Sequence, residues 1–300
     1  MSNFFQNGPA EDQGYINIRD LEHARPYRDY VESLWEAFEP LADHHFLSDA
    51  KAHFLERFWE MYLAKALKVA GWSPQTPGNK GPDILISCSK KKIFLEATAP
   101  GTGEGDDAVP EMKPRAVQAV PEKEILLRLR SAISSKLDAW KKWRSQNIVD
   151  SGDTFVIAVN GRRIRAGLGD SEPPFIVRAV FPIGPLAAVW DKSKHEIVET
   201  YYDYRDSLNK KSGAKVETDI FLSSEFSDVS AVVYSFVDAA NHPQVEGQDF
   251  LLVHNPSAKN PLQRGYFKLG REYWLMGNEV VNQNWNERSQ PNNQPHEDRS

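Results

Sequence analysis

The sequence predicts an α/β protein in which helices largely cover a mixed sheet. Three observations lead to this fold class. Several short runs are almost continuously apolar and show little strict alternation, which is typical of strands buried on both faces. Helix-like segments separate these runs, and the first elements follow the order helix, strand, strand, helix, strand. At 300 residues the chain can bury a sizeable core.

The first helix of this core is predicted over residues 48–70, with Ser48 or Asp49 as its cap and a glycine directly after it. Apolar side chains lie on two sides of this helix, so we expect it to pack into the body of the protein. A loop rich in proline and glycine follows. The strands 83–88 and 93–99 then form a predicted hairpin around the turn SKKK.

A long helix is predicted over residues 121–144, with Pro121 at its first position. Further strands are predicted at TFVIAVNG, FIVRAVFPIG, VSAVVYSFVD and FLLVHNP, which begin at residues 154, 175, 229 and 250. The two ends of the chain are polar, so we expect a flexible N-terminus over 1–20 and a disordered tail over 277–300. A single domain then spans 21–276, with its core motifs at 48–160.

Composition and charge exclude several classes of protein. The net charge of −6 gives no overall basic footprint, although the segment 111–144 has nine Lys or Arg against four Asp or Glu, a local excess of five positive charges. No apolar run approaches the length of a membrane-spanning helix. The single cysteine, Cys88, excludes a disulfide framework and a cysteine zinc cluster. A cytoplasmic, membrane-free protein is therefore expected.

The segment GPDILISCSKKKIFLEATAPG places Glu96 inside a run that otherwise reads as a buried strand. An ionised carboxylate at such a position is costly unless a cation or hydrogen bonds compensate it. Glu96 is therefore a site candidate, although a structural ion pair with Lys92 or Lys136 would also account for it. Asp83 lies at the start of the preceding strand, where an aspartate can also serve only to bond the backbone of a turn.

These residues resemble the motif of the PD-(D/E)XK superfamily, the restriction-endonuclease-like nucleases. The resemblance rests on Glu60 in a helix, Pro82-Asp83, Glu96 and the amphipathic helix 121–144, and it covers about residues 50–160. It implies a mixed central sheet flanked by helices, here with C-terminal α/β elaborations. It also implies that Asp83 and Glu96 bind Mg²⁺ or Mn²⁺, with Glu60 as an accessory acid. Glu60 could equally be an exposed helix acid.

The sequence departs from the family pattern at one position, because the lysine expected two residues after the glutamate is Thr98. At 100° per residue, Lys136 falls in the middle of the apolar stripe of the helix 121–144. Its ammonium could reach the carboxylates while its stem packs on the core, and we predict that it replaces the missing lysine. The alternative is a lysine that extends from under the helix into water.

The sequence therefore predicts a metal-dependent nuclease acting on nucleic acid, with DNA as the expected substrate. The alternatives are a catalytically inactive nuclease-like domain that binds nucleic acid or protein, and an interaction protein with coincidental carboxylates. The sequence does not decide between a monomer and a homodimer. The expected contacts to nucleic acid are basic residues at the end of the helix 121–144 and after the strand that begins at residue 154: Lys141, Lys142, Arg144, Arg162 and Arg163. A solvated helix end and a plain surface loop are the competing interpretations of these charges.

Overall fold

The computed structural model describes residues 2–78, 80–88, 91–111, 113, 117–164 and 172–289. Its centre is a mixed sheet of seven strands in the order β1-β2-β3-β8-β9-β10-β11. These strands are β1 (Ile84–Cys88), β2 (Lys91–Thr98), β3 (Thr154–Asn160), β8 (Ala231–Ser235), β9 (Leu251–His254), β10 (Arg271–Met276) and β11 (Glu279–Asn284). Two further two-stranded sheets join β4 (Ile183–Asp191) to β5 (Glu196–Tyr204) and β6 (Ser207–Asn209) to β7 (Lys215–Glu217).

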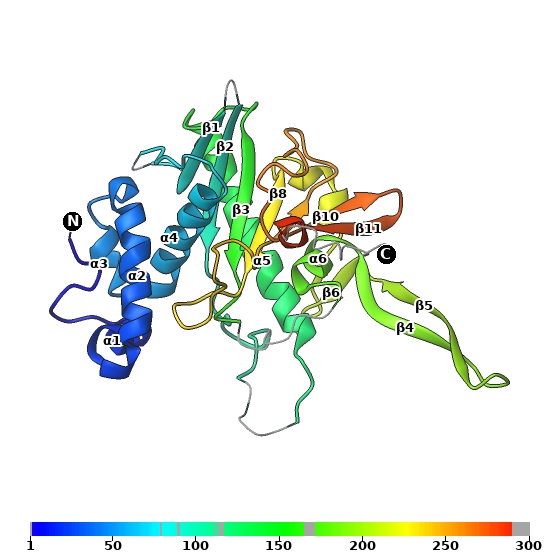
Figure 1. Cartoon of the computed structure of the whole chain (residues 1–300). Coiled ribbons are helices and arrows are strands. Elements are labelled where there is room, and N and C mark those ends of the chain that lie inside the picture. Colours follow the sequence, from blue (N-terminus) through cyan, green and yellow to red (C-terminus); the bar gives the residue numbers. More distant parts are fainter. Residues whose placement is uncertain are drawn as a thin grey trace, which may run out of the picture.

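Helices cover both faces of the central sheet, as predicted for this fold class (Figure 1). They are α1 (Gln13–Asp20), α2 (Arg25–Phe38), α3 (Phe46–Ala50), α4 (Phe54–Val69), α5 (Glu122–Ser145) and α6 (Phe175–Val180). Short 3-10 helices are η1 (Glu22–Ala24), η2 (Glu39–Leu41), η4 (Ile220–Leu222), η5 (Ser224–Phe226) and η6 (Asn286–Ser289). Along β2, Leu95 and Ala97 share a core with α1–α4, whereas Phe94 shares a core with α5 and α6.

The pairing of the first strands brings the ends of several strands together at one side of the sheet. The strands β1 and β2 pair antiparallel with Ile84 opposite Leu95, which confirms the predicted hairpin. The strands β2, β3 and β8 run parallel, so their carboxyl ends meet at one end of the sheet, where β1 also begins. The outer edge of β1 is closed by Gln75, whose backbone exchanges two hydrogen bonds of 2.8 Å with the backbone of Leu85.

The predicted helix 48–70 is divided in two, with α3 and α4 separated by a turn at residues 51–53. The separation follows from a contact that local sequence does not contain. The Asp12 side chain accepts a hydrogen bond from the Phe54 backbone N–H at 3.2 Å, so an acid from the N-terminal segment satisfies the start of α4. The cap expected at Ser48 or Asp49 is therefore wrong for the main helix.

The run FIVRAVFPIG was predicted as a strand, but its first six residues form the helix α6. All six are buried, and five of them are apolar residues of the core that α5 and the sheet share. A short run with so few polar positions lacks the periodicity that would distinguish a helix from a strand. The Arg178 guanidinium forms an ion pair with Glu122 at the start of α5, which ties the two helices together.

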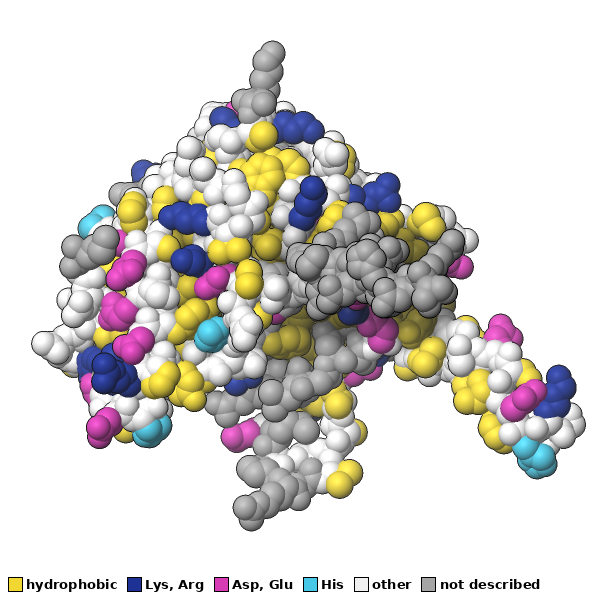
Figure 2. All heavy atoms as spheres, viewed as in Figure 1, with side chains coloured by type: hydrophobic (Ala, Val, Ile, Leu, Met, Phe, Trp, Pro, Cys, Tyr) yellow, Lys and Arg dark blue, Asp and Glu magenta, His cyan; other side chains and the backbone are white. Residues whose placement is uncertain are grey.

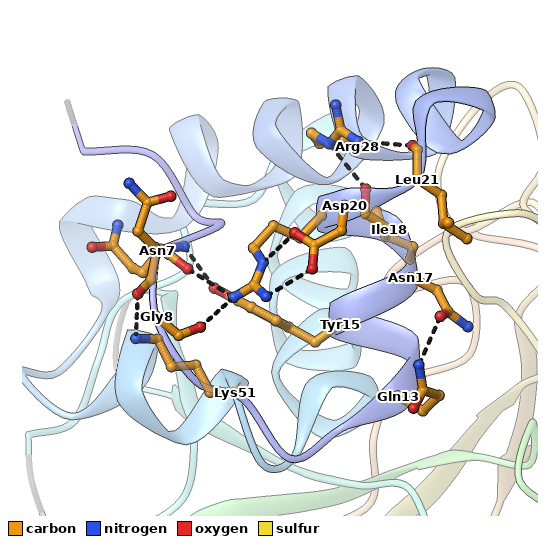
Figure 3. Close-up of polar contacts among 12 residues, drawn as sticks. Asn7, Gly8, Gln13, Tyr15, Asn17, Ile18, Asp20, Leu21, Arg28 and Lys51 are labelled. Carbon is orange, nitrogen blue, oxygen red and sulfur yellow. Dashed lines mark hydrogen bonds and ion pairs between the residues drawn. The ribbon is translucent and has the colours of Figure 1, made fainter.

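The N-terminal segment is ordered, contrary to the flexible 1–20 that the sequence predicted. Phe4 and Phe5 are buried in the core beside α1. Figure 3 shows the polar contacts that hold this segment: the Arg19 guanidinium donates to the Gly8 carbonyl at 2.7 Å, and the Lys51 ammonium donates to the Asn7 carbonyl at 3.2 Å. Two buried phenylalanines therefore outweigh the polar composition around them.

The expected tail 277–300 also differs from the structure, because residues 279–284 form β11 and pair with β10 along their whole length. The sequence EVVNQN has few apolar residues, and its strand depends on the neighbour with which it pairs. Residues 290–300 lie outside the described part. No helix among the described residues is both long and apolar enough to cross a membrane.

Candidate functional site

The β1–β2 hairpin brings Asp83 beside Glu96. The Asp83 carboxylate accepts a hydrogen bond of 2.7 Å from the Ala97 backbone N–H, so it is fixed against the carboxyl end of β2. Glu96 lies two residues before the end of the same strand and is only 6% exposed. Its side chain projects to the face that carries Phe94, which is the face covered by α5. Two carboxyl groups thirteen positions apart in sequence therefore meet at one end of the sheet.

The helix α5 delivers a cation to this pair. The Lys136 ammonium donates to Glu96 Oε1 at 2.6 Å, and the lysine side chain is 25% exposed. Ile133, Leu137 and Trp140 on the same helix are buried in the core, which fixes the stem of Lys136 against the sheet. The structure therefore makes the contact between Lys136 and Glu96 that the helical spacing predicts.

The helix α4 contributes a third carboxyl group from the other side of the sheet. Glu60 is 9% exposed, and the Arg57 guanidinium donates to both of its oxygens at 2.8 and 3.1 Å. The same guanidinium donates to the Asp49 carboxylate at 2.9 Å. Glu60 is therefore held by its own helix. Burial raises the pKa of Glu60, and the nearby charges of Asp83 and Glu96 raise it further, against the opposing effect of Arg57.

Sequence reasoning did not single out Arg57. The available signal was the spacing of Arg57 and Glu60, since residues three positions apart are neighbours on a helix. With Arg57 included, the candidate site contains three carboxyl groups and two cations: Glu60, Asp83, Glu96, Arg57 and Lys136.

Burial and the excess of carboxyl groups set the protonation of this cluster. Burial, followed by the charge of Asp83, raises the pKa of Glu96 to about 8, although Lys136 lowers it. Burial also raises the pKa of Asp83, against the opposing effects of Lys136 and of the Ala97 N–H. Burial alone would lower the pKa of Lys136, but the negative charges of Glu96, Asp83 and Glu60 outweigh it, so that this pKa is raised. The ammonium is therefore charged near neutral pH, while the carboxyl groups hold a proton among them.

The donor set fits a hard divalent cation. Glu96 Oε2 is a buried oxygen that receives no N–H from the described residues, and it lies close enough to the Asp83 carboxyl group for the two acids to share a proton. A cation between the two carboxylates could take the place of the proton. Within the described ranges, no three His, Cys, Asp or Glu side chains are grouped to hold a metal. Two carboxylates suit Mg²⁺ or Mn²⁺, because Mg²⁺ keeps several waters, and they do not suit zinc.

The rival lysine lies elsewhere. Lys92 is at the far end of the hairpin, where its ammonium is 3.7 Å from the Asp150 carboxylate and its side chain is 52% exposed. Thr98 is half-buried at the end of β2, opposite Val159 of β3. Lys136 is thus the lysine that contacts Glu96.

The arginines expected to bind nucleic acid are engaged with acids of the same chain. Arg144 forms an ion pair with Asp228 at 2.8 Å, and Arg162 forms one with Asp238 at 2.5 Å. Arg163 contacts Glu56 at 2.5 Å and a second acid at 3.6 Å. Lys141 and Lys142 are exposed at the end of α5. The sequence could not reveal these partners, because each is at least 76 positions away in the chain.

A cavity of about 660 Å³ opens beside α1 and the start of α4. Its lining combines aromatic side chains with paired polar groups from the segments that follow β3 and β8: Tyr27, Phe54, Phe236, Arg162, Arg163 and Asn241. Arg163 connects this cavity to Glu56, which is one helical turn from Glu60 on α4. The cavity and the carboxyl cluster therefore lie at the same end of the sheet.

Comparison of the chain with protein-family models, with curated proteins and with solved structures gave no match in any of the three.

Proposed function

We propose that the protein is a metal-dependent nuclease that hydrolyses phosphodiester bonds, with DNA as the expected substrate. The observation that supports this most directly is the buried Glu96, which lies beside Asp83, contacts the Lys136 ammonium at 2.6 Å and has a second buried oxygen that receives no N–H from the residues that the structure describes. A buried carboxyl group with a strongly raised pKa and a cationic neighbour is typical of functional sites.

Each residue has a role that its position allows. Asp83 and Glu96 would hold Mg²⁺ or Mn²⁺, which supplies charge neutralisation for a phosphate and lowers the pKa of a bound water. The Lys136 ammonium has three N–H donors and uses one on Glu96, which leaves donors for a water or a phosphate oxygen. Arg57 stabilises Glu60, and Glu60 adds negative charge behind the pair.

The order of elements supports a restriction-endonuclease-like fold as part of this proposal. The helix α4 with Glu60 precedes the hairpin with Asp83 and Glu96, and α5 and β3 follow, with β3 parallel to β2. The family lysine would stand at Thr98. In this chain the helix α5 carries the ammonium to the same glutamate from a position 40 residues later.

A cleavage assay tests the proposal. Purified protein is incubated with plasmid, linear duplex and single-stranded DNA and with RNA, in Mg²⁺, in Mn²⁺ and in a chelator. We expect cleavage that requires the divalent ion and is lost in Asp83→Asn and Glu96→Gln. Lys92→Met is the matched control, because Lys92 is a lysine of β2 outside the cluster. Cleavage that persists in Glu96→Gln, or that survives the chelator, would contradict the proposal.

One observation favours the runner-up, an inactive nuclease-like domain that binds nucleic acid or protein. Arg144, Arg162 and Arg163 are neutralised by carboxylates of the chain, and the net charge is −6, so few cations are free to attract phosphate. If nucleic acid binds to the protein but is not cut under any of the conditions above, the binding function takes first place.

A further inference from the structure

The strands β4 and β5 form a ribbon that projects from the body of the protein (Figure 1). All nine residues of β5 are exposed, and so are most of β4. Figure 2 shows hydrophobic side chains along this ribbon. Two-stranded ribbons are marginally stable alone, and contiguous exposed apolar surface usually marks an interaction site.

The apolar residues gather on one face of the ribbon. Leu186 pairs with Tyr202 and Trp190 pairs with Ile197. Leu186, Ala188 and Trp190 share a face because side chains alternate along β4, and a register shift between Val189 and Trp190 passes over Val198 and brings Ile197 opposite Trp190. In the first pair Leu186 is 59% exposed and Tyr202 is 41% exposed; in the second pair the exposed fractions are 54% for Trp190 and 56% for Ile197. The opposite face instead combines apolar and acidic side chains, such as Val189 opposite Glu199. The ribbon is therefore amphipathic and has an uncovered apolar face.

The base of the same ribbon carries a cavity of about 800 Å³. Its apolar lining comes from the residue after α6, the ribbon, η4 and β10–β11: Phe181, Ile183, Tyr204, Leu222, Leu275 and Val280. Tyr202 lines the cavity and also belongs to the apolar face, so the two surfaces are continuous. The chain thus has a large aromatic side chain at the ribbon tip, Trp190, and a cavity that could hold such a side chain at the ribbon base.

We propose that the ribbon is a dimerisation arm and that its occupant is a second copy of this chain. When two ribbons lie antiparallel about a twofold axis, with their apolar faces together, the tip of each reaches the base of the other. Trp190 of one copy then enters the cavity of its partner, and the same contact is repeated by symmetry. Specific interfaces bury roughly 1,000 Å² or more, and the surface offered to this one consists of two nine-residue strands and one cavity from each copy.

Charge supports the same arrangement. The turn at the tip carries Lys192 and Lys194, whereas the cavity is bordered by the acids Asp203 and Glu279 and by Glu172, which forms an ion pair with Arg271 at 3.5 Å. The turn also contains acids, but the carboxylate of Asp191 accepts three hydrogen bonds from Ser193 and Lys194 within the turn itself. The acidic residues on the ribbon stem make a nucleic acid a poorer occupant than a protein surface.

Sedimentation velocity on the full chain between about 1 and about 100 µM tests this inference, which does not depend on the nuclease function. We expect a dimer whose Kd rises at least about thirtyfold in Trp190→Ser, as for a central aromatic anchor. Val189→Ser is the matched control on the other ribbon face and should retain the dimer. Circular dichroism and the melting temperature verify that each variant is folded.

A mixing experiment distinguishes a second copy from any other occupant. Leu222→Ser alters the cavity, and we expect it also to weaken the dimer. Equal amounts of Trp190→Ser and Leu222→Ser should associate more tightly with each other than either does alone, because one pair of intact tip and cavity is then restored. A wild-type chain that stays monomeric over the whole range overturns the inference. So does a Trp190→Ser variant that keeps the wild-type mass but binds DNA or RNA more weakly, which would assign the ribbon to nucleic acid.

Discussion

Metal binding at Asp83 and Glu96 should compete with a proton. The pKa of Glu96 is raised to about 8, so below that pH the folded protein holds a proton that a divalent cation must displace. At pH 7, one unit below this pKa, about nine-tenths of the molecules carry the proton, and we expect about 0.9 proton to be released per ion bound.

The size of the effect follows from the same pKa. Competition weakens the apparent affinity about fivefold from pH 8 to pH 7 and about ninefold from pH 7 to pH 6, and it costs about 1.4 kcal/mol at pH 7. The direction is fixed by the sign of the shift, since a raised carboxyl pKa favours the protonated form and therefore opposes the metal as the pH falls. Lys136→Met removes a charge that lowers the pKa of Glu96, so the pH dependence should move to higher pH.

Isothermal titration of Mn²⁺ in two buffers of different ionisation enthalpy measures the released protons directly. Glu96→Gln should release none and should bind the ion much more weakly. An apparent enthalpy that is the same in both buffers at pH 7, together with an affinity that does not change between pH 6 and pH 8, would refute the assignment of Glu96 as a metal ligand.

Three further outcomes are expected. Lys136→Met should lower the cleavage rate at least about a hundredfold, as for loss of a group that stabilises charge in the transition state, with circular dichroism unchanged, whereas Lys92→Met should keep the rate within about twofold. Trp140→Ala should lower the free energy of unfolding by about 3–5 kcal/mol in urea titrations, because Trp140 is 2% exposed and stacks on Phe155 at 4.3 Å; a loss below about 1 kcal/mol would contradict this. Deletion of residues 2–8 removes two buried phenylalanines and should lower the melting temperature by about 10 °C or more, whereas a flexible segment would leave it unchanged.

The sequence predicted the parts of the fold that depend on local periodicity. The hairpin and the long helix have clear patterns, and the helical spacing alone placed Lys136 on the side of the sheet where it contacts Glu96. The errors lie where distant contacts decide. Asp12 sets the start of α4, and β11 depends on pairing with β10. The residues of α6 are all buried, so its sequence shows no helical periodicity. The β5 strand of the ribbon is exposed along its whole length, so burial imposes no alternating pattern on its sequence.

The candidate site shows the same division. Its three predicted carboxyl groups and its lysine are on elements with strong sequence signals, and the structure brings them together. The contacts of the arginines could not be predicted, because an ion pair between Arg163 and Glu56 spans 107 positions and leaves no local pattern. The number of basic residues in a sequence segment therefore overestimates how many cations are available to bind phosphate.

The backbone pairing of Gln75 with Leu85 has a consequence for aggregation. An open outer strand offers unpaired N–H and C=O groups to any other extended chain, and proteins commonly block such strands. Gln75 occupies these groups at Leu85, the second residue of β1 and only two residues after Asp83. A substitution that loosens residues 72–78, such as Gln75→Pro, would remove the Gln75 N–H that bonds the Leu85 carbonyl. It would expose an apolar strand directly beside the carboxyl cluster. The same short segment that holds Asp83 in register would thus also keep the protein soluble.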